Sequence, residues 1–186
     1  MSSCSWPGKN QIMQQYHDNE WCVPSYDDVY IFEMLILEGA QAGLSWNIVL
    51  SKREEYQKAF RHFDIDYCSK LTDEELETIK DQYNIIKNRT KINAVRSNAI
   101  AVVNLQKEFG SFSTFLWNYV DGHPVINSWV SEGQIPAQTP LSEQISKDLK
   151  KRGFKFVGPV IIYSFMQAIG MVDDHIRTCP YHSRNR

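Results

Sequence analysis

The chain has 186 residues, of which 42% are hydrophobic and 23% are charged, and its formal net charge is -2. These values are typical of one folded domain, and the overall charge gives no indication of a nucleic-acid-binding protein. The N-terminal segment lacks the basic region and apolar run of a secretory signal, and no apolar stretch reaches the roughly 20 residues of a membrane span. Four cysteines without an export signal favour a reducing compartment, so we expect a cytoplasmic protein.

The charged residues are unevenly distributed along the chain. Segment 87–96 contains four basic residues and no acidic one, segment 147–155 contains five basic residues and one acidic residue, and segment 73–81 is acidic. Such asymmetry can give a neutral molecule one positive face. The alternative is that these runs are solvated helix faces, and charge alone does not decide between the two.

The first predicted helix runs from about residue 27 to residue 42 and can end at Gly43. At about 100° per residue, Glu38 falls within roughly 60° of Ile31 and of the other apolar positions of this helix. Glu33 falls on the opposite, polar side. A carboxylate on an apolar stripe is either tied to a buried partner or placed there for a function.

Helix signals recur through the rest of the chain, whereas the alternation typical of strands is almost absent. Residues 121–138 are typical of a loop. The sequence therefore predicts an all-α protein. Further helices are expected to begin at Ser45, at Thr72 (a capping box), at residue 88 and at Ser111.

A helical hairpin is predicted near the C-terminal end, over about residues 141–170. Thr139 can cap its first helix, and Gly158 precedes its second helix. A glycine turn exposes backbone N–H groups that can bind phosphate, and nearby basic side chains attract a DNA backbone. The alternative is an ordinary hairpin with solvated lysines. The residues expected to contact DNA are Lys150, Lys151, Arg152, Lys155 and Gly158.

Histidine and cysteine residues near both ends of the chain indicate a candidate metal site. His175 and Cys179 are four residues apart, so on a helix they would share one face, as two zinc ligands must. Four such ligands would close a structural site that joins the two termini, whereas the alternative is a set of unbound side chains. The other candidate ligands are Cys4 and His17, with Cys22 and His182 as substitutes.

Several local motifs coincide with those of one enzyme family. They are Cys4 with Trp6, YHDNEW at residues 16–21, EGAQAGLSW at 38–46, KKRGFKFVGP at 150–159 and DHIRTC at 174–179. Together they resemble the 3-methyladenine DNA glycosylase I family of bacteria, which removes alkylated adenine, and the resemblance covers essentially the whole chain. It implies one glycosylase domain over residues 1–186, with a helix-hairpin-helix fold whose two helical lobes surround a cleft.

The resemblance also implies roles for individual residues. One structural zinc ion would be bound by Cys4, His17, His175 and Cys179, from segments 4–17 and 175–179. The base pocket would contain Glu38, Tyr16 and Trp46, with Trp6 nearby. Glu38 would accept hydrogen bonds from the adenine edge, and Trp46 would stack on the flipped base, which is cationic when it is methylated at N3.

The implied reaction is hydrolysis of the N-glycosidic bond after the base has been flipped out of the duplex. Positive charge develops on the sugar, which favours a nearby carboxylate such as Glu38. Leu44, next to Gly43 on a bend, is the candidate that fills the gap left in the base stack. Asp173 follows the hairpin, where the wider superfamily of base-excision glycosylases has an aspartate, and we expect it only to assist.

Three positions depart from the family pattern. Asp173 stands where this family often has asparagine. Met13 stands where a further aromatic residue is expected on the pocket wall, which would soften stacking. Cys22 replaces the usual glycine of EWGVP and puts a spare thiol beside the expected zinc ligands.

Two other functions fit parts of the pattern. A non-catalytic, zinc-containing helix-hairpin-helix module that binds or senses damaged DNA would leave Glu38 and Trp46 unexplained. A zinc-dependent deaminase would need an open metal position and an H-x-E motif with a later C-x-x-C, and neither motif is present. We therefore expect a monomeric glycosylase without lyase activity, whose partners are alkylated double-stranded DNA and released 3-methyladenine.

Overall fold

Capping side chains begin most of the helices in the computed structural model, which describes residues 3–186. Each of these side chains accepts a hydrogen bond from a backbone N–H of the first turn, which would otherwise have no partner. Thr72 and Glu75 complete the predicted capping box. The capping residues are Asn10, Asp27, Asp64, Thr72, Asn88, Ser111 and Thr139.

The described residues form ten α-helices, two short 3-10 helices and two short strands. The α-helices are α1 (Gln11–Asn19), α2 (Asp28–Gln41), α3 (Trp46–Ser51), α4 (Arg53–Ala59), α5 (Ile65–Lys70), α6 (Asp73–Gln82), α7 (Arg89–Phe109), α8 (Phe112–Trp117), α9 (Pro140–Lys151) and α10 (Pro159–Ala168). The 3-10 helices are η1 (Asn118–Val120) and η2 (Glu132–Gln134), and the strands are β1 (Val125–Ile126) and β2 (Val172–Asp173).

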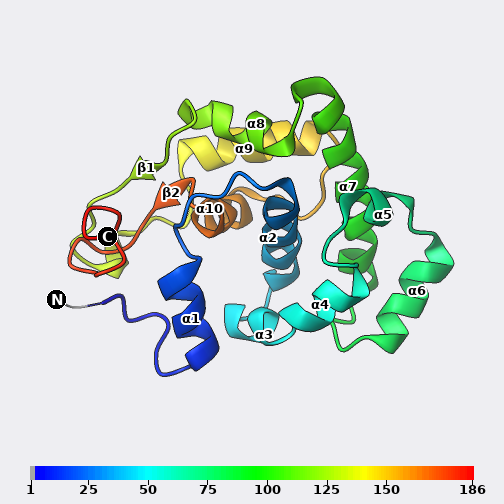
Figure 1. Cartoon of the computed structure of the whole chain (residues 1–186), viewed down its shortest axis with the longest axis horizontal. Helices are drawn as coiled ribbons and strands as arrows, with labels where there is room; N and C mark the ends of the chain where they lie inside the picture. Colours follow the sequence, from blue (N-terminus) through cyan, green and yellow to red (C-terminus); the bar gives the residue numbers. More distant parts are fainter. Residues whose placement is uncertain (1–2) are drawn as a thin grey trace.

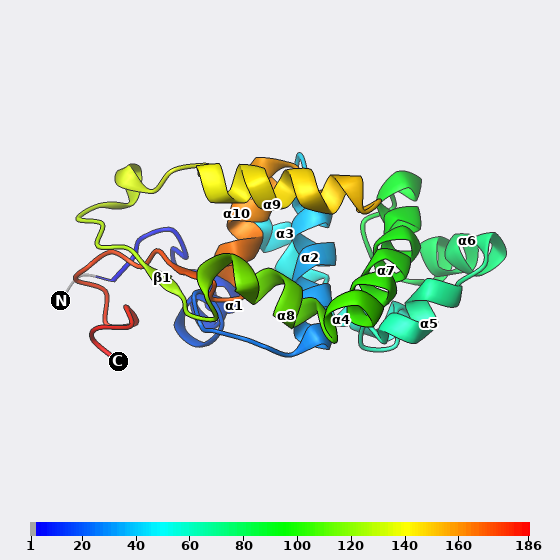
Figure 2. The same cartoon turned by 90° about the horizontal axis from the view of Figure 1, so that it is seen from above.

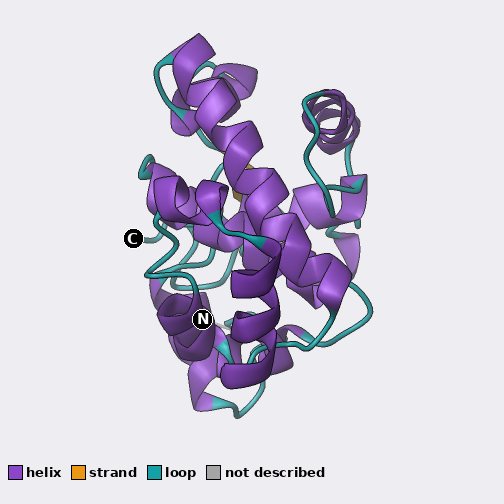
Figure 3. Ribbon diagram, turned by 90° about the vertical axis from the view of Figure 1, so that its right-hand side faces the viewer, coloured by secondary structure: helices purple, strands orange, loops and turns teal. Residues whose placement is uncertain are grey.

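The sequence predicted an all-α protein, and the described residues are mostly helical but also form two short strands (Figure 3). Strand β1 lies within residues 121–138, which the sequence predicted to be a loop, and it pairs in parallel with β2. Val125 N–H donates to the Met171 carbonyl at 3.0 Å, and Asn127 N–H donates to the Asp173 carbonyl at 3.1 Å. This pairing fixes the long connection against the end of α10.

Helix α2 is buried on all sides at the centre of the molecule, with α3, α7, α8 and α10 packed around it (Figure 1). The polar side that the sequence predicted for Glu33 is therefore wrong, because Glu33 is only 7% exposed. Its carboxylate accepts hydrogen bonds from Arg53 Nε and Gln57 Nε2, each at 2.8 Å. A buried ion pair thus explains one acid of this helix but not Glu38.

The predicted hairpin is formed by α9 and α10, which are joined by the loop at residues 152–158. Helix α10 ends beside the N-terminal part of the chain. Gly170 has a φ of +69°, and a Cβ atom there would lie 2.1 Å from the carbonyl carbon of Val23. Only glycine fits this close approach of two backbones.

The two ends of the described chain meet on the same side of the molecule (Figure 2). Cys22 N–H donates to the Gln167 carbonyl at 2.8 Å, and Ser25 N–H donates to the Ile169 carbonyl at 3.0 Å. Buried apolar side chains from both ends share one hydrophobic core. None of the helices in residues 3–186 has both the length and the apolar composition needed to cross a membrane.

Candidate active site

A cavity of about 220 Å³ lies where α1, α2, α10 and the start of α3 come together. It brings together the four residues predicted for the base pocket, which come from three separate segments of the chain. A larger groove of about 550 Å³ lies between α8 and α9, but of the predicted residues it contains only Lys151 and Arg152. The residues lining the smaller cavity are Trp6, Tyr16, Trp21, Glu38, Gln41, Trp46, Ile135, Ser164 and Gln167.

Glu38 is placed on the wall of this cavity by the last turns of α2. It is 4% exposed, and within residues 3–186 no side chain forms an ion pair or hydrogen bond with its carboxylate. Because burial disfavours the charged form, the pKa of Glu38 is raised to about 8. The carboxylate is therefore free to accept hydrogen bonds from a ligand, and a cationic ligand would favour its charged form.

Aromatic rings surround this carboxylate. The Tyr16 and Trp46 rings meet edge to face with centroids 5.4 Å apart, and the Trp6 and Trp21 rings do so at 5.1 Å. The Tyr16 hydroxyl and the Trp6 indole N–H are buried without a hydrogen-bond partner in the described chain. Burial, together with the nearby Glu38, raises the pKa of Tyr16, so its hydroxyl stays a donor. The cavity thus combines unused donors with an unused acceptor.

Sequence reasoning missed several residues of the cavity wall. Gln41 lies three residues after Glu38 on α2, so it shares the same face. Ser164 and Gln167 are also three apart, and they are polar residues in the otherwise apolar helix α10. These polar residues, spaced three apart in otherwise apolar helices, were the sequence signal that could have predicted their place on the cavity wall. The Gln167 side chain is oriented by donating to Asp174 Oδ2 at 2.8 Å.

Asp173 is not among the residues lining the cavity. Its Oδ1 accepts hydrogen bonds from the backbone N–H of His175 at 3.1 Å and from its ring Nδ1 at 2.9 Å, and its Oδ2 accepts from Ser183 N–H at 2.7 Å. Burial raises the pKa of Asp173, but these hydrogen bonds outweigh it and hold the pKa at about 2. This geometry positions His175 and does not support the catalytic assistance predicted for Asp173. Met13 also lies outside the cavity lining.

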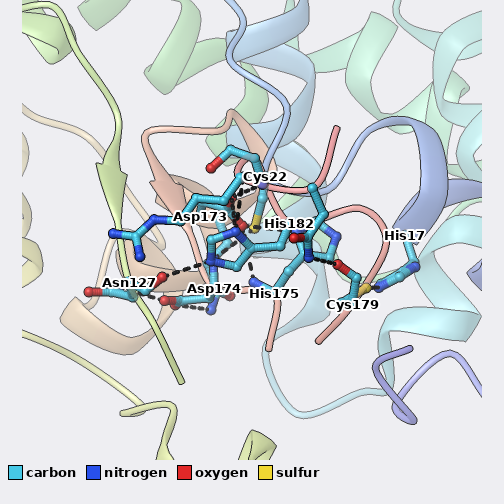
Figure 4. A network of polar contacts seen from close by, with 12 residues as sticks. His17, Cys22, Asn127, Asp173, Asp174, His175, Cys179 and His182 are labelled. Atoms are coloured by element: carbon cyan, nitrogen blue, oxygen red, sulfur yellow. Dashed lines mark hydrogen bonds and ion pairs between the residues drawn. The ribbon is translucent and has the colours of Figure 1, made fainter. Parts of the chain in front are cut away.

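The candidate metal ligands gather between the two ends of the chain (Figure 4). One ligand atom from each of Cys4, His17 and Cys179 lies within 4.8 Å of the others. The His17 and His175 ring centroids are 4.8 Å apart, and His175 Nε2 is buried without a partner among the described residues. Cys4, His17 and Cys179 therefore form one candidate ligand group, and the neighbouring His175 belongs to a second group with Cys22 and Asp173.

Both imidazoles are oriented by carboxylates. His17 Nδ1 lies 2.7 Å from Asp18 Oδ1, and His175 Nδ1 lies 2.9 Å from Asp173 Oδ1. His17 Nε2 lies 3.8 Å from Cys179 Sγ, and His175 Nε2 is left without a partner among the described residues. A carboxylate partner on the second ring nitrogen is usual for a histidine that binds zinc. The helical spacing predicted for His175 and Cys179 is wrong, because residues 175–179 form turns rather than a helix.

The two substitute ligands have other partners. His182 Nε2 lies 2.9 Å from the Asn127 carbonyl oxygen. Cys22 Sγ accepts a hydrogen bond from Asp174 N–H at 3.3 Å, although it also lies within 4.8 Å of ligand atoms of Asp173 and His175. Cys22 has a φ of +61°, a conformation that favours glycine, which explains why glycine suits this position.

The bend after α2 carries the predicted plug residue. Gly43 has a φ of +77°, and the Leu44 side chain is 38% exposed. Lys91 of α7 stabilises the bend, because its Nζ donates to the Ala40 and Ala42 carbonyls at 2.9 and 2.7 Å. Leu44 thus projects from a fixed turn immediately before α3 and Trp46.

The residues predicted to contact DNA differ in how free they are. Lys150, Lys151 and Lys155 are exposed, although Lys151 Nζ lies 3.7 Å from Asp148 Oδ1. Arg152 instead donates to both carboxylate oxygens of Glu108, at 2.6 and 3.0 Å, and lies over aromatic rings of the groove between α8 and α9. Gly158 is the N-cap residue of α10, which begins at Pro159. No side chain caps this helix, so the backbone N–H groups of its first turn donate to no capping side chain.

Comparison with known proteins decides the family of the chain. The family model for methyladenine glycosylase matches residues 6–182. The chain belongs to the methyladenine glycosylase family.

Relatives and solved structures of methyladenine glycosylases match this chain over its full length. DNA-3-methyladenine glycosylase 1 of Escherichia coli K12 is 42% identical over 186 residues, which cover 100% of both chains. A crystal structure of 3-methyladenine DNA glycosylase I has 46% identity and a TM-score of 0.94, covering 97% of this chain and 100% of that chain. A variant crystallised in complex with 3-methyladenine has 35% identity, a TM-score of 0.95 and 98% coverage of each chain.

Proposed function

We propose that this chain is a base-excision repair glycosylase that releases 3-methyladenine from alkylated DNA by hydrolysing the N-glycosidic bond. The observation that carries the proposal is the buried carboxylate of Glu38, which lies on the wall of an aromatic cavity and has no partner within residues 3–186. The family of the chain supports the same activity. A non-catalytic DNA-binding module would give no reason for an unpaired acid in this place, because burying it has a free-energy cost.

Recognition follows from the charge of the damaged base. A nucleotide methylated at N3 of adenine is cationic, whereas normal adenine is neutral. The faces of Trp46 and Trp6 attract a cation, and Glu38 adds a full negative charge once the cation lowers its pKa. The Tyr16 hydroxyl and the Trp6 indole N–H are donors that have no partner within the described chain. The cavity therefore favours the alkylated base over the normal one.

Bond cleavage needs little acid catalysis, because the C–N bonding electrons pass to a base that already carries a positive charge and leaves neutral. The sugar becomes positively charged in the transition state, and Glu38 is the carboxylate of the cavity that stabilises this charge. Water then adds to the sugar carbon and loses a proton. No lysine lines the cavity in residues 3–186, so a Schiff base with the sugar, and hence lyase activity, is not expected.

Flipping requires contacts outside the cavity. Leu44, exposed on its fixed bend, enters the space that the flipped base leaves in the stack. The α9–α10 hairpin binds the phosphate backbone as in other helix-hairpin-helix glycosylases, through backbone N–H groups near Gly158 and the exposed Lys150, Lys151 and Lys155. Arg152 contributes less, because its guanidinium is paired with Glu108.

We further infer that Cys4, His17, His175 and Cys179 bind one zinc ion. The donor set fits: two thiols, two imidazoles with carboxylate partners, and a buried His175 Nε2 that has no hydrogen-bond partner among residues 3–186. When bound, the zinc would be fully coordinated by protein and would supply cross-linking rather than chemistry. Its ligands hold α1, and with it Tyr16, against the C-terminal segment.

The deciding experiment measures release of free base. Duplex DNA methylated to contain 3-methyladenine is incubated with the purified protein, and the released bases are separated by chromatography. We expect free 3-methyladenine to appear, together with abasic sites that remain unbroken. Binding of the methylated DNA without release of base would contradict the proposal and favour the non-catalytic damage-sensing module. We expect the enzyme to act as a monomer in the bacterial cytoplasm, at the nucleoid.

A further inference from the structure

Helix α7 anchors the bend that carries Leu44. Lys91 in its first turns donates from Nζ to the Ala40 carbonyl at 2.9 Å and to the Ala42 carbonyl at 2.7 Å. The last turn of α2 contains no basic residue of its own. Lys91 therefore supplies, from another helix, both the hydrogen bonds and the positive charge that the C-terminal end of a helix favours. It fixes the residue directly before Gly43.

Two turns further along α7, Asn98 anchors the hairpin loop. Asn98 is 2% exposed, and its amide forms two hydrogen bonds with the backbone of Lys155. Its Oδ1 accepts from Lys155 N–H at 2.7 Å, and its Nδ2 donates to the Lys155 carbonyl at 3.1 Å. The next residue, Phe156, has a φ of +57°, which costs free energy for a side chain of this size. The paired amide holds this strained part of the loop in place.

The two anchored segments also touch each other. A Cβ atom on Gly39, the neighbour of Glu38, would lie 3.1 Å from Phe156 Cβ. The contact leaves a void of only about 10 Å³, which is lined by residues that include Gly39, Phe156, Lys91 and Asn98. The end of α2, the hairpin loop and α7 therefore meet in one closely packed seam.

We propose that Lys91 and Asn98 are positioning residues for base flipping. They lie on one face of α7 about 10 Å apart along its axis, and they fix the plug bend relative to the hairpin loop. This inference rests on the proposed function, in which both segments contact the damaged strand. Leu44 can enter the stack productively only if the hairpin holds the backbone at a fixed distance, and small errors of placement are costly in rate. Neither residue lines the base cavity.

The test separates flipping from recognition of the base. Lys91→Met and Asn98→Leu are compared with Lys107→Met and Asn104→Leu, which make the same changes at exposed positions of α7. Single-turnover release of 3-methyladenine from duplex DNA is measured beside the affinity for free 3-methyladenine, read from tryptophan fluorescence. We expect release to fall about tenfold or more in the first pair, because the contacts with DNA are misplaced. Affinity for the free base should change by less than about twofold, because neither side chain contacts the cavity.

Conservative variants sharpen the test. Lys91→Arg retains donors for both carbonyls and should restore most of the release. Asn98→Asp retains the acceptor for Lys155 N–H but loses the donor, so its rate of base release should lie between those of wild type and Asn98→Leu. If the leucine variant does not fold, the aspartate variant tests the inference in its place. Release equal to that of the two control variants would overturn the inference. So would a parallel loss of free-base affinity, since that would mean a purely structural role. Absence of release by the wild-type protein would instead overturn the proposed function, and this inference with it.

Discussion

Two glutamates five residues apart on α2 are both buried but have opposite surroundings. Glu33 is paired with Arg53, whereas Glu38 faces the cavity without a partner in the described chain. The charge of Glu33 is balanced by the protein, whereas the carboxylate of Glu38 remains available to interact with a ligand. The contrast supports the role proposed for Glu38.

Replacing Glu38 with glutamine removes the charge and keeps the shape. We expect Glu38→Gln to lower the rate of 3-methyladenine release by about a hundredfold, because a preorganised charge facing the transition state is lost. The base-release assay measures this directly. Glu74→Gln, at an exposed position of α6, is the matched control and should behave as wild type. An unchanged rate in Glu38→Gln would remove Glu38 from the mechanism.

The raised pKa of Glu38 also predicts how stability depends on pH. The pKa is about 8 in the folded protein against an ordinary value of 4.5, so the folded state binds more protons than the unfolded state between these values. The contribution is complete below about pH 4.5 and is lost as the pH rises towards about 8. The free energy of unfolding of wild type, relative to Glu38→Gln, should therefore fall over this range by up to about 5 kcal/mol.

Urea unfolding of both proteins at a series of pH values measures this difference. Subtracting the glutamine variant cancels the titration of the other groups. A difference that does not vary with pH would contradict the raised pKa, because it would mean that the pKa of Glu38 is the same in the folded and unfolded states.

At the scale of elements, the end of α10 depends on one glycine. A methyl group at position 170 would overlap the backbone of Val23 and Pro24, which cannot move as a flexible side chain can. We expect Gly170→Ala to lower the free energy of unfolding by more than about 3 kcal/mol. Gly133→Ala, in open space and without a positive φ, should change it by less than about 0.5 kcal/mol. Denaturant unfolding of the two variants makes the comparison.

The helices with strong local signals were predictable. Asp27, Thr72, Ser111 and Thr139 cap their helices in the structure, and Gly110, with a φ of +86°, ends α7. Such signals act within one turn, so the sequence displays them directly. Ser45 is the exception, because it precedes α3 without forming a side-chain cap.

Features that depend on distant partners were not predictable in the same way. Glu33 is buried because Arg53 comes from another helix, and the β1–β2 pair joins segments about 47 residues apart. The spacing of His175 and Cys179 suggested a helix, but the turn there is shaped by Asp173 and Ser183. No local pattern encodes these contacts.

At the scale of the whole molecule, the proposed zinc ion would join the two ends of the chain. We expect one zinc per folded protein, and its removal by a chelator should lower stability and alter tryptophan fluorescence, because Trp21 stacks on His17 with ring centroids 5.8 Å apart. Metal analysis and thermal unfolding check both points.

Cysteine variants provide the controls for the metal. Cys4→Ser should lose the zinc, whereas Cys68→Ser, buried far from the cluster in α5, should retain it. Cys22→Ala should also retain it if the spare thiol is not a ligand. A native protein without bound metal, or one unaffected by the chelator, would contradict the zinc proposal but leave the glycosylase proposal intact.

The polar and aromatic residues of the cavity could be predicted from the sequence, but the complete set of lining residues could not. Trp6, Tyr16, Glu38 and Trp46 stood out by residue type and by resemblance to a family. Ile135, by contrast, comes from the long connection before α9 and reaches the cavity only through the folded loop. Its place depends on Glu132, whose carboxylate accepts hydrogen bonds from Ser5 and Trp6.

The cavity walls come from opposite ends of the polypeptide, with Trp6 and Tyr16 on one side and Ser164 and Gln167 on the other. During synthesis the first pair leaves the ribosome long before the second. A nascent chain therefore cannot assemble its base-binding pocket until translation is nearly finished. Prematurely terminated products that lack Ser164 and Gln167 should therefore have no excision activity.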